Sequence, residues 1–195
     1  MIAGLILAAG ESTRMGRDKA TLAYRGRTFL EVVVETLGAA HIEPLIVVLG
    51  CRAPEIARQV SIEPARAVLN PDYRSGQTSS LQAGLRALLP NPPEAVLLCL
   101  VDHPAVGAET LERLVAAFRR SDAPCVIPTY QGRRGHPVLI GSRLFDELLG
   151  LSSDAGADSV VRKYRSVTEF VEVEDEGVVL DVDDPRCYQQ LISRP

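Results

Sequence analysis

Hydrophobic positions along the chain form two alternating patterns. Short apolar runs rich in β-branched residues predict buried strands at residues 3–7, 44–50, 65–70, 95–102 and 124–130. Between these runs, apolar residues recur three and four positions apart, which predicts helices at residues 28–40, 53–60, 78–89 and 108–120. This alternation favours a mostly parallel, Rossmann-like sheet covered by helices on both faces, a three-layer α/β sandwich.

The pattern changes in the last third of the chain. Residues 135–141 and the alternating residues 167–174 predict strands, helices are expected near 142–149 and 157–164, and a further apolar run at 178–182 predicts a strand before the last helix. We expect strands of mixed direction here. There is no long linker and no internal repeat, so residues 1–195 are predicted to form a single domain.

Composition narrows the function. The chain has 195 residues, 46% of them apolar, and a net charge of -4, which argues against nucleic acid or a membrane surface as partner. The apolar start lacks the basic region and cleavage site of a signal peptide, and no run approaches the roughly 20 apolar residues of a membrane span. Four scattered cysteines form no C-x-x-C pair, so we expect a cytoplasmic protein with free thiols.

The loop after the first strand is unusually basic and glycine-rich. Residues 10–19 include Gly10, Gly16, Arg14 and Lys19, but their spacing matches neither the P-loop nor the dinucleotide fingerprint. Glycines still permit close backbone approach to oxygens, and the two cations add positive charge. The loop therefore predicts a site for a polyanion, with an ordinary glycine-rich turn as the alternative.

Aspartates follow two of the later apolar runs. Asp102 comes after residues 95–101 and Asp183 after residues 178–182. Ligands of open α/β sheets collect beyond the carboxyl ends of the strands, so the basic loop and Asp102 are expected to face one ligand. Carboxylates together with substrate phosphates suit Mg²⁺. The alternatives are a turn-capping role for Asp102 and, for Asp184 before Pro185, the N-cap of the last helix, while the role of Asp181 stays open.

Five motifs now point to a family. "LAAGESTRMGRDK" at residues 7–19 resembles the signature of MobA-like NTP transferases, the nucleotidyltransferases related to molybdenum cofactor guanylyl- and cytidylyltransferases. "NPDYRSGQTSSLQAGL", "LVDHP", "GHPV" and "DVDDP" follow in the family's order, so the resemblance spans nearly the whole chain. It implies a nucleotide-diphospho-sugar transferase-like fold and transfer of a nucleoside monophosphate from an NTP to a phosphate, with release of pyrophosphate.

The resemblance also implies roles for individual residues. Arg14 and Lys19 would hold the triphosphate, and Asp102 and Asp183 would bind Mg²⁺; Arg14, Lys19 and Asp102 would be the catalytic groups. The nucleotide-binding set would be Leu7, Ala8, Ala9, Gly10, Arg14, Lys19, Asn70, Gly76 and Ser80. In this family "LAAG" tends toward cytidylyl and "LAGG" toward guanylyl transfer, so the methyl group of Ala9 favours CTP over GTP. Thr78 or Ser79 is expected to cap the helix beside the nucleoside.

The segment around "QGRRGHPVLIG" suggests the second substrate. Gly135 allows close approach, Arg133, Arg134 and His136 can meet an anionic group, and the resemblance implies that His136 borders the acceptor. The implied acceptor is a molybdopterin-type cofactor, with a molybdoenzyme as a further partner. "LVDHP" departs from the more usual "GDQP", with His103 in place of glutamine, so details of the acceptor side are in doubt.

Three alternatives stay open. A related enzyme would use GTP or would act on a sugar or alcohol phosphate, whereas a non-catalytic molybdenum-cofactor carrier or chaperone would keep the fold without turnover. Arg14, Lys19, Asp102 and Asp183 are all present, which argues against a pure carrier, because a carrier does not need a metal-binding pair of carboxylates.

Overall fold

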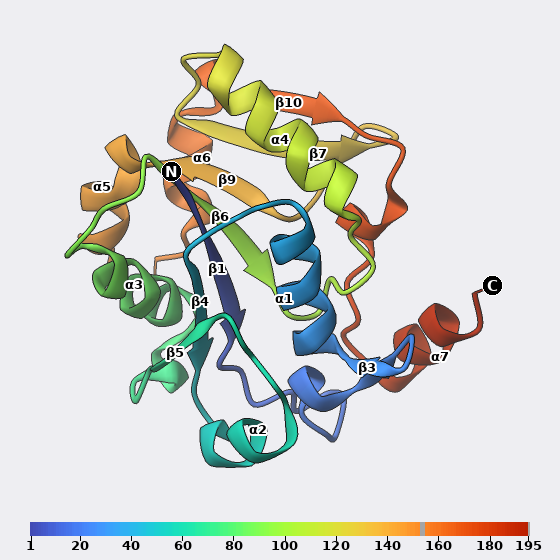
Figure 1. The fold of residues 1–195 in the computed structure, drawn as a ribbon. Helices are drawn as coiled ribbons and strands as arrows, with labels where there is room; N and C mark the ends of the chain where they lie inside the picture. The colour runs from blue at the N-terminus through green and yellow to red at the C-terminus, as the bar shows by residue number, and fades with distance from the viewer. Residues whose placement is uncertain (153–154, 195) are drawn as a thin grey trace.

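The chain is organised around one mixed β-sheet (Figure 1). The computed structural model describes residues 1–152 and 155–194. Within these residues eight strands join in the order β10-β7-β9-β6-β1-β4-β5, with β8 paired to β7. They are β1 (Ile2–Ala8), β4 (Leu45–Leu49), β5 (Arg66–Leu69), β6 (Ala95–Leu100), β7 (Cys125–Tyr130), β8 (Arg133–Arg134), β9 (Val138–Gly141) and β10 (Glu169–Glu172). A small hairpin of β2 (Ala23–Tyr24) and β3 (Arg27–Thr28) lies outside this sheet.

Most of the sheet is parallel. β1 pairs in parallel with β4 and β6, β4 pairs in parallel with β5, and β10 pairs in parallel with β7. β9 is antiparallel to both β6 and β7, and the short β8 is antiparallel to β7. The expected mixture of directions in the last third is therefore confirmed, and the sheet is mostly parallel as predicted.

Helices cover both faces of the sheet (Figure 1). They are α1 (Phe29–Ala39), α2 (Ala53–Gln59), α3 (Gln77–Leu88), α4 (Ala108–Arg120), α5 (Phe145–Leu149), α6 (Asp158–Lys163) and α7 (Pro185–Ile192). Buried residues of α1, α2 and α4 belong to one apolar cluster, and those of α3, α5 and α6 belong to a second cluster on the opposite face. This is the predicted three-layer arrangement. No helix among the described residues is long and apolar enough to cross a membrane.

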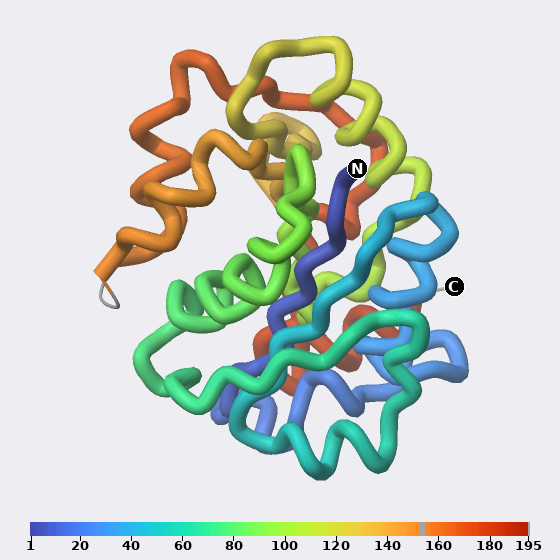
Figure 2. The backbone as a smooth tube through the Cα atoms, turned by 60° about the vertical axis from the view of Figure 1, so that its left-hand side comes forward, coloured from blue at the N-terminus to red at the C-terminus, as the bar shows by residue number. Residues whose placement is uncertain are grey.

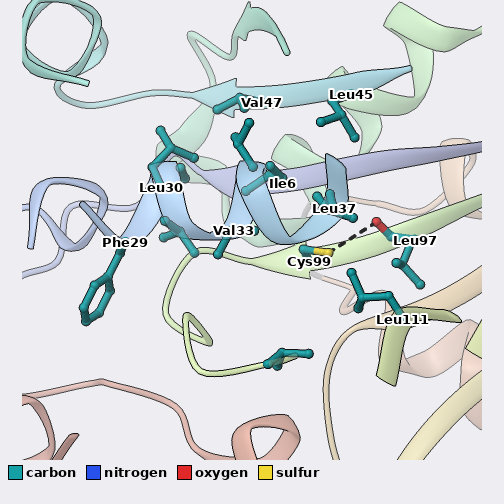
Figure 3. Packing of buried hydrophobic residues seen from close by; sticks show 14 of the residues in the cluster. Ile6, Phe29, Leu30, Val33, Leu37, Leu45, Val47, Leu97, Cys99 and Leu111 are labelled. Atoms are coloured by element: carbon teal, nitrogen blue, oxygen red, sulfur yellow. Dashed lines mark hydrogen bonds between the residues drawn. The ribbon is translucent and has the colours of Figure 1, made fainter. Parts of the chain in front are cut away.

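The central strands are apolar on both faces because alternate side chains enter different clusters. In β1, Ile2 and Ile6 enter the cluster beneath α1, whereas Ala3 and Leu5 enter the one beneath α3. Figure 3 shows side chains of α1 packed against the first of these faces. Each fully buried side chain of this size contributes about 1.5–3 kcal/mol of transfer free energy. Packing on both faces therefore fixes the central strands, and with them the positions of their carboxyl ends.

Helix starts are set by local hydrogen bonds. Thr28 and Glu31 form a capping box at α1, and Asp184 accepts a hydrogen bond from the Cys187 amide at 2.8 Å, which confirms the predicted cap of α7. The predicted cap of α3 is wrong. Its N-cap is Gly76. The hydroxyl of Thr78 donates to the carbonyl oxygen of Ala155 at 2.6 Å, and that of Ser79 donates to the carbonyl oxygens of Asp72 and Gly76, so neither caps the helix.

The strand predicted at residues 178–182 is also wrong. The segment contains a 3-10 helix, η5 (Glu176–Val179), followed by irregular backbone. Val178 and Val182 are fully buried, so the apolar pattern reflects core packing and not strand pairing. The amide of Val182 donates to the carbonyl oxygen of Asp102 at 2.9 Å, which brings this segment to the carboxyl end of β6.

The predicted ligand edge is where distant parts of the chain meet. Figure 2 shows the C-terminal segment near the carboxyl end of β1 and the loop that follows it. Two further 3-10 helices, η1 (Lys19–Thr21) and η2 (Tyr73–Ser75), lie at the same edge. Loops after β1, β5 and β6 and the C-terminal segment therefore converge on one region.

Candidate active site

A cavity of about 360 Å³ opens at the carboxyl ends of β1 and β6. Of the residues predicted to form the site, Leu7, Ala8, Ala9, Gly10, Arg14, Lys19, Gly76, Ser80, Asp102 and Asp183 line it. Ser12, Thr13, Asp18, Tyr73 and Gln77 line it as well and were not predicted. The basic loop and the two aspartates thus face one space, which is called the first cavity below.

The basic loop is shaped by its own backbone. Ser12 has a φ of 51° and Gly16 a φ of 74°, the left-handed region that favours glycine. The carbonyl oxygen of Ser12 accepts from the amides of Met15 and Gly16, and its hydroxyl accepts from the amide of Lys19 at 3.2 Å. Asp18 then caps η1 by accepting from the Ala20 amide. These bonds fix the backbone from which Lys19 enters the cavity.

Four charged side chains meet at the centre. The Nζ of Lys19 is 2.8 Å from Oδ2 of Asp102 and 2.7 Å from Oδ1 of Asp183. Nη2 of Arg14 lies 2.9 Å from Oδ2 of Asp183. The side chain of Lys19 is 13% exposed, whereas that of Arg14 is 73% exposed. Lys19 is therefore enclosed between the carboxylates, while Arg14 stays open to solvent and to a ligand.

These contacts shift two pKa values. Burial acts to lower the pKa of Lys19, but the charge of Asp102 and hydrogen bonds to both carboxylates raise it above its ordinary value. The hydrogen bond from Lys19 lowers the pKa of Asp183. Lysine stays protonated and Asp183 ionised at neutral pH. Oδ1 of Asp102 is buried and has no hydrogen-bond partner among residues 1–152 and 155–194.

The residues present fit a hard divalent cation. Mg²⁺ binds in proteins through one or two carboxylates, with substrate phosphates and water completing its shell. Asp102 and Asp183 share a cation already, and the unpartnered Oδ1 of Asp102 offers a further lone pair. Among the described residues no group of three or more His, Cys, Asp or Glu side chains could hold a metal. A metal here would therefore need ligands from the substrate.

Asp183 is held by the segment around η5, part of which was predicted as a strand. Asp175 accepts hydrogen bonds from Gly107, Thr110 and Gly177, which fastens η5 to the start of α4. The amide of His136 donates to the Val178 carbonyl oxygen at 2.8 Å on the other side of η5. Asp183 reaches the cavity through this anchored segment and not through a strand.

The predicted nucleoside residues divide into two groups. Gly76 and Ser80 line the first cavity, but Asn70 does not. Asn70 is 3% exposed, and its Nδ2 donates to the hydroxyls of Ser79 and Ser80. Its Oδ1 accepts from the Asp72 amide, so Asn70 links the loop before α3 to the first turn of that helix.

A second cavity of about 390 Å³ lies on the other side of the aspartates. It shares Leu100, Asp102 and Asp183 with the first cavity, and its other lining residues are His103, Arg133, Arg134, Gly135, His136, Val178, Val179 and Asp181. The predicted acceptor residue His136 lies here, outside the first cavity. A side chain at Gly135 would collide with the Val178 backbone, because a Cβ there would lie 2.1 Å from its carbonyl oxygen.

Two histidines form the inner side of the second cavity. The rings of His103 and His136 have centroids 5.2 Å apart. Burial, and after it the charge of His103, lower the pKa of His136 to about 4, so its ring is neutral at neutral pH. Nδ1 of His136 is buried and finds no hydrogen-bond partner in the described part of the chain, while Nδ1 of His103 lies 3.3 Å from the Gly177 carbonyl oxygen. Arg133 and Arg134, both exposed, bring positive charge to this cavity.

Comparison with known proteins adds three findings. The family model of the MobA-like NTP transferase domain matches residues 4–168. Nicotine blue oxidoreductase from Paenarthrobacter nicotinovorans is 34% identical over 203 residues, covering 98% of this chain and 96% of that protein. A probable molybdenum cofactor guanylyltransferase from Opitutus terrae is 34% identical over 125 residues, covering 64% of this chain and 59% of that protein.

Among solved structures, the complex of Rv0371C with manganese from Mycobacterium tuberculosis H37Rv is similar over the full length. It has a TM-score of 0.84 at 28% identity, covering 100% of this chain and 99% of that chain. This agreement confirms the three-layer, nucleotide-diphospho-sugar transferase-like fold.

Proposed function

Because the chain belongs to the MobA-like NTP transferase family, we propose that it transfers CMP from CTP to the phosphate of a molybdopterin-type cofactor and releases pyrophosphate. The family makes it a nucleotidyltransferase related to molybdenum cofactor guanylyltransferases. One observation carries the proposal: Asp102 and Asp183 lie where a nucleotide-sized cavity meets a second cavity with exposed arginines. A molybdoenzyme would receive the product.

The reaction needs little covalent chemistry from the protein. An oxygen of the acceptor phosphate attacks the α-phosphorus and forms a P–O bond, while the bond from the α-phosphorus to the bridging oxygen breaks. Pyrophosphate leaves with that electron pair, and the ionised acceptor needs no general base. Positioning and stabilisation of charge on the phosphoryl oxygens supply most of the catalysis.

The first cavity suits the nucleotide. Arg14 and the glycine-rich loop would contact the triphosphate, because Arg14 and the loop residues Gly10, Ser12 and Thr13 line the cavity. Gly76 and Ser80, at the start of α3, would lie beside the nucleoside. Asp102 and Asp183 would hold Mg²⁺, which would supply positive charge to the phosphoryl oxygens. Mn²⁺ is the alternative metal.

The base preference depends on the strand end. Ala9 is 4% exposed and lines the first cavity together with Leu7 and Ala8. A methyl group at this position narrows the space for a purine, which supports CTP over GTP. The molybdenum cofactor relatives are named guanylyltransferases, so GTP is the competing nucleotide.

The second cavity suits the acceptor phosphate. Arg133 and Arg134 would attract its charge, and His136 would border the bound acceptor as a neutral ring. Their position beyond the aspartates supports an acceptor site opposite the proposed triphosphate site, which is the arrangement that transfer to the α-phosphorus requires.

The test is pyrophosphate release from each of the four NTPs with Mg²⁺ and the molybdenum cofactor. Release that needs CTP and the cofactor supports the proposal. Release with GTP, or with a sugar or alcohol phosphate as acceptor, would replace the finer assignment. Tight cofactor binding without pyrophosphate release from any NTP would favour a carrier.

One observation supports a second candidate. A relative that covers 98% of this chain is named nicotine blue oxidoreductase. Loss of nicotine blue absorbance with a reduced nicotinamide cofactor, but without any NTP, would support an oxidoreductase. The loop lacks the dinucleotide fingerprint, so nucleotidyl transfer is the better supported function.

A further inference from the structure

Lys19 occupies the position that the proposed function gives to a metal. Its Nζ lies within hydrogen-bond distance of both carboxylates, 2.8 Å from Asp102 and 2.7 Å from Asp183. Asp102 and Asp183 are 81 positions apart in the sequence (183 − 102). The ammonium group therefore joins the end of β6 to the C-terminal segment. It is the cation that bridges the two carboxylates, and the exposed Arg14 pairs with Asp183 alone.

The backbone of Lys19 is fixed, but its side chain is long. The amide is held by the Ser12 hydroxyl, Asp18 caps the turn, and the neighbouring Ala20 is fully buried. Four methylene groups separate this fixed backbone from the ammonium, which can therefore reach another anion without movement of the loop. Lys19 also lines the first cavity, where the triphosphate is proposed to bind.

A lysine and a dication cannot share these two carboxylates. Like charges a few ångströms apart repel strongly where water is scarce, and the Lys19 side chain is only 13% exposed. If the ammonium moved away with no new partner, it would become an uncompensated, largely buried charge, which is costly. A polyphosphate in the first cavity removes that cost, because it offers the ammonium an anion.

We propose that Lys19 is the resident cation of Asp102 and Asp183 in the nucleotide-free protein, and that the nucleotide polyphosphate draws it away so that a divalent cation enters with the nucleotide. The inference rests on the proposed function for the assignment of the two aspartates as metal ligands. The coupling is reciprocal: nucleotide strengthens metal binding by the same factor by which metal strengthens nucleotide binding.

The test measures binding of Mn²⁺ alone to the nucleotide-free full chain, by electron paramagnetic resonance, for the wild type, Lys19→Gln and Arg17→Gln. Glutamine removes the resident charge, so Lys19→Gln should bind Mn²⁺ roughly tenfold more tightly than the wild type. Arg17 is exposed, carries the same charge in the same loop and does not line either cavity. Arg17→Gln should therefore bind Mn²⁺ like the wild type.

A second measurement follows stability. Without metal, Lys19→Gln leaves Asp102 without its ion-pair partner and Asp183 with Arg14 alone, so its thermal midpoint in EDTA should fall and should recover in Mn²⁺. The wild type should change little between these conditions. Equal Mn²⁺ affinity in Lys19→Gln and the wild type would overturn the inference, as would equal gains in Lys19→Gln and Arg17→Gln, which would indicate general electrostatics.

The wild type alone keeps the inference testable if Lys19→Gln fails to fold. Its Mn²⁺ affinity should rise roughly tenfold or more when CTP is bound, beyond the Mn²⁺ that CTP binds in solution. Equal affinity with and without nucleotide would overturn the inference. None of these measurements needs an acceptor or turnover, so a failure of the proposed transfer, seen as absent pyrophosphate release, is distinguishable from a failure of the inference.

Discussion

The two cavities share Asp102 and Asp183 but differ in construction. The first is formed by small residues, loop backbone and the start of α3, and its shape depends on close packing at the ends of central strands. The second is formed by two exposed arginines over paired histidines, and it depends on the 3-10 segment η5. The first cavity should admit few ligands, because backbone geometry sets its contacts. The second should accept more varied ligands, because the arginine side chains on the short strand β8 can change conformation. Substitutions should therefore separate the two cavities.

The shared carboxylate is the sharpest test, because both cavities depend on it. Asp102→Asn keeps the side-chain shape but removes the negative charge, so transfer should fall at least about a hundredfold, a loss of roughly 3 kcal/mol of transition-state stabilisation. CTP affinity should fall less, because Arg14 and the loop residues that line the first cavity are unchanged. Pyrophosphate release and the thermal midpoint are measured together.

Asp184→Asn is the matched control. Asp184 caps α7, and asparagine is an equally good N-cap, so turnover should stay near the wild-type value. Near-normal turnover of Asp102→Asn would contradict the metal-ligand assignment, and so would a loss of turnover that unfolding fully explains.

The second cavity is tested alone by His136→Gln. Of the two shared-aspartate cavities, His136 lines only the second, so the KM for the acceptor should rise about tenfold, which corresponds to one lost hydrogen bond, while the KM for CTP stays unchanged. His41→Gln, in an exposed position on a separate groove, controls for loss of a histidine. A rise in the KM for CTP, with none for the acceptor, would show that the two cavities are not separate sites.

Asp184 also shows that neighbouring aspartates differ in role. The Cys187 amide hydrogen bond lowers the pKa of Asp184, so the ionised cap stabilises the fold above its unfolded pKa of 3.8, and this stability is lost as pH falls through the lower folded pKa. Asp184→Ala should therefore lower the thermal midpoint at pH 7, and the difference from the wild type should close as the pH falls below about 4. A difference that persists in acid would show that the ionised cap is not its cause.

Much of the fold follows from patterning. Strands that are apolar on both faces predicted a covered parallel sheet, because both side-chain sets of β1 and β4 enter a core. The same logic failed at residues 178–182. There Val178 and Val182 are buried in the core, but their backbone forms a 3-10 turn and a hydrogen bond to Asp102 instead of pairing with a strand. An apolar pattern alone does not distinguish a buried strand from a buried irregular segment.

The site was predictable where a motif faces the cavity directly. The basic loop and Asp102 met as expected, because the ends of neighbouring parallel strands share an edge. The contact of Lys19 with Asp183 depends on how η5 docks, through Asp175, and local sequence carries no information on that docking. Asn70 lies in a predicted motif but does not line the first cavity. Its side-chain amide instead donates hydrogen bonds to the hydroxyls of Ser79 and Ser80.

The smallest expected effect concerns only the first cavity. Ala9→Gly removes one methyl group beside the base, so kcat/KM for GTP relative to CTP should rise severalfold, within the limit of about tenfold to 200-fold that one methylene imposes. Ala8→Gly is the matched control: it loses the same methyl group and gains the same backbone freedom, but the Ala8 side chain packs on the opposite face of the sheet, whereas Ala9 packs on the face of α3. A shift in Ala9→Gly alone would identify the methyl group as the cause. Equal shifts in both variants would indicate a loosened strand end, and a strict preference retained by Ala9→Gly would place base selection elsewhere, with Tyr73 and Gln77 as the next positions to vary because both line the same cavity.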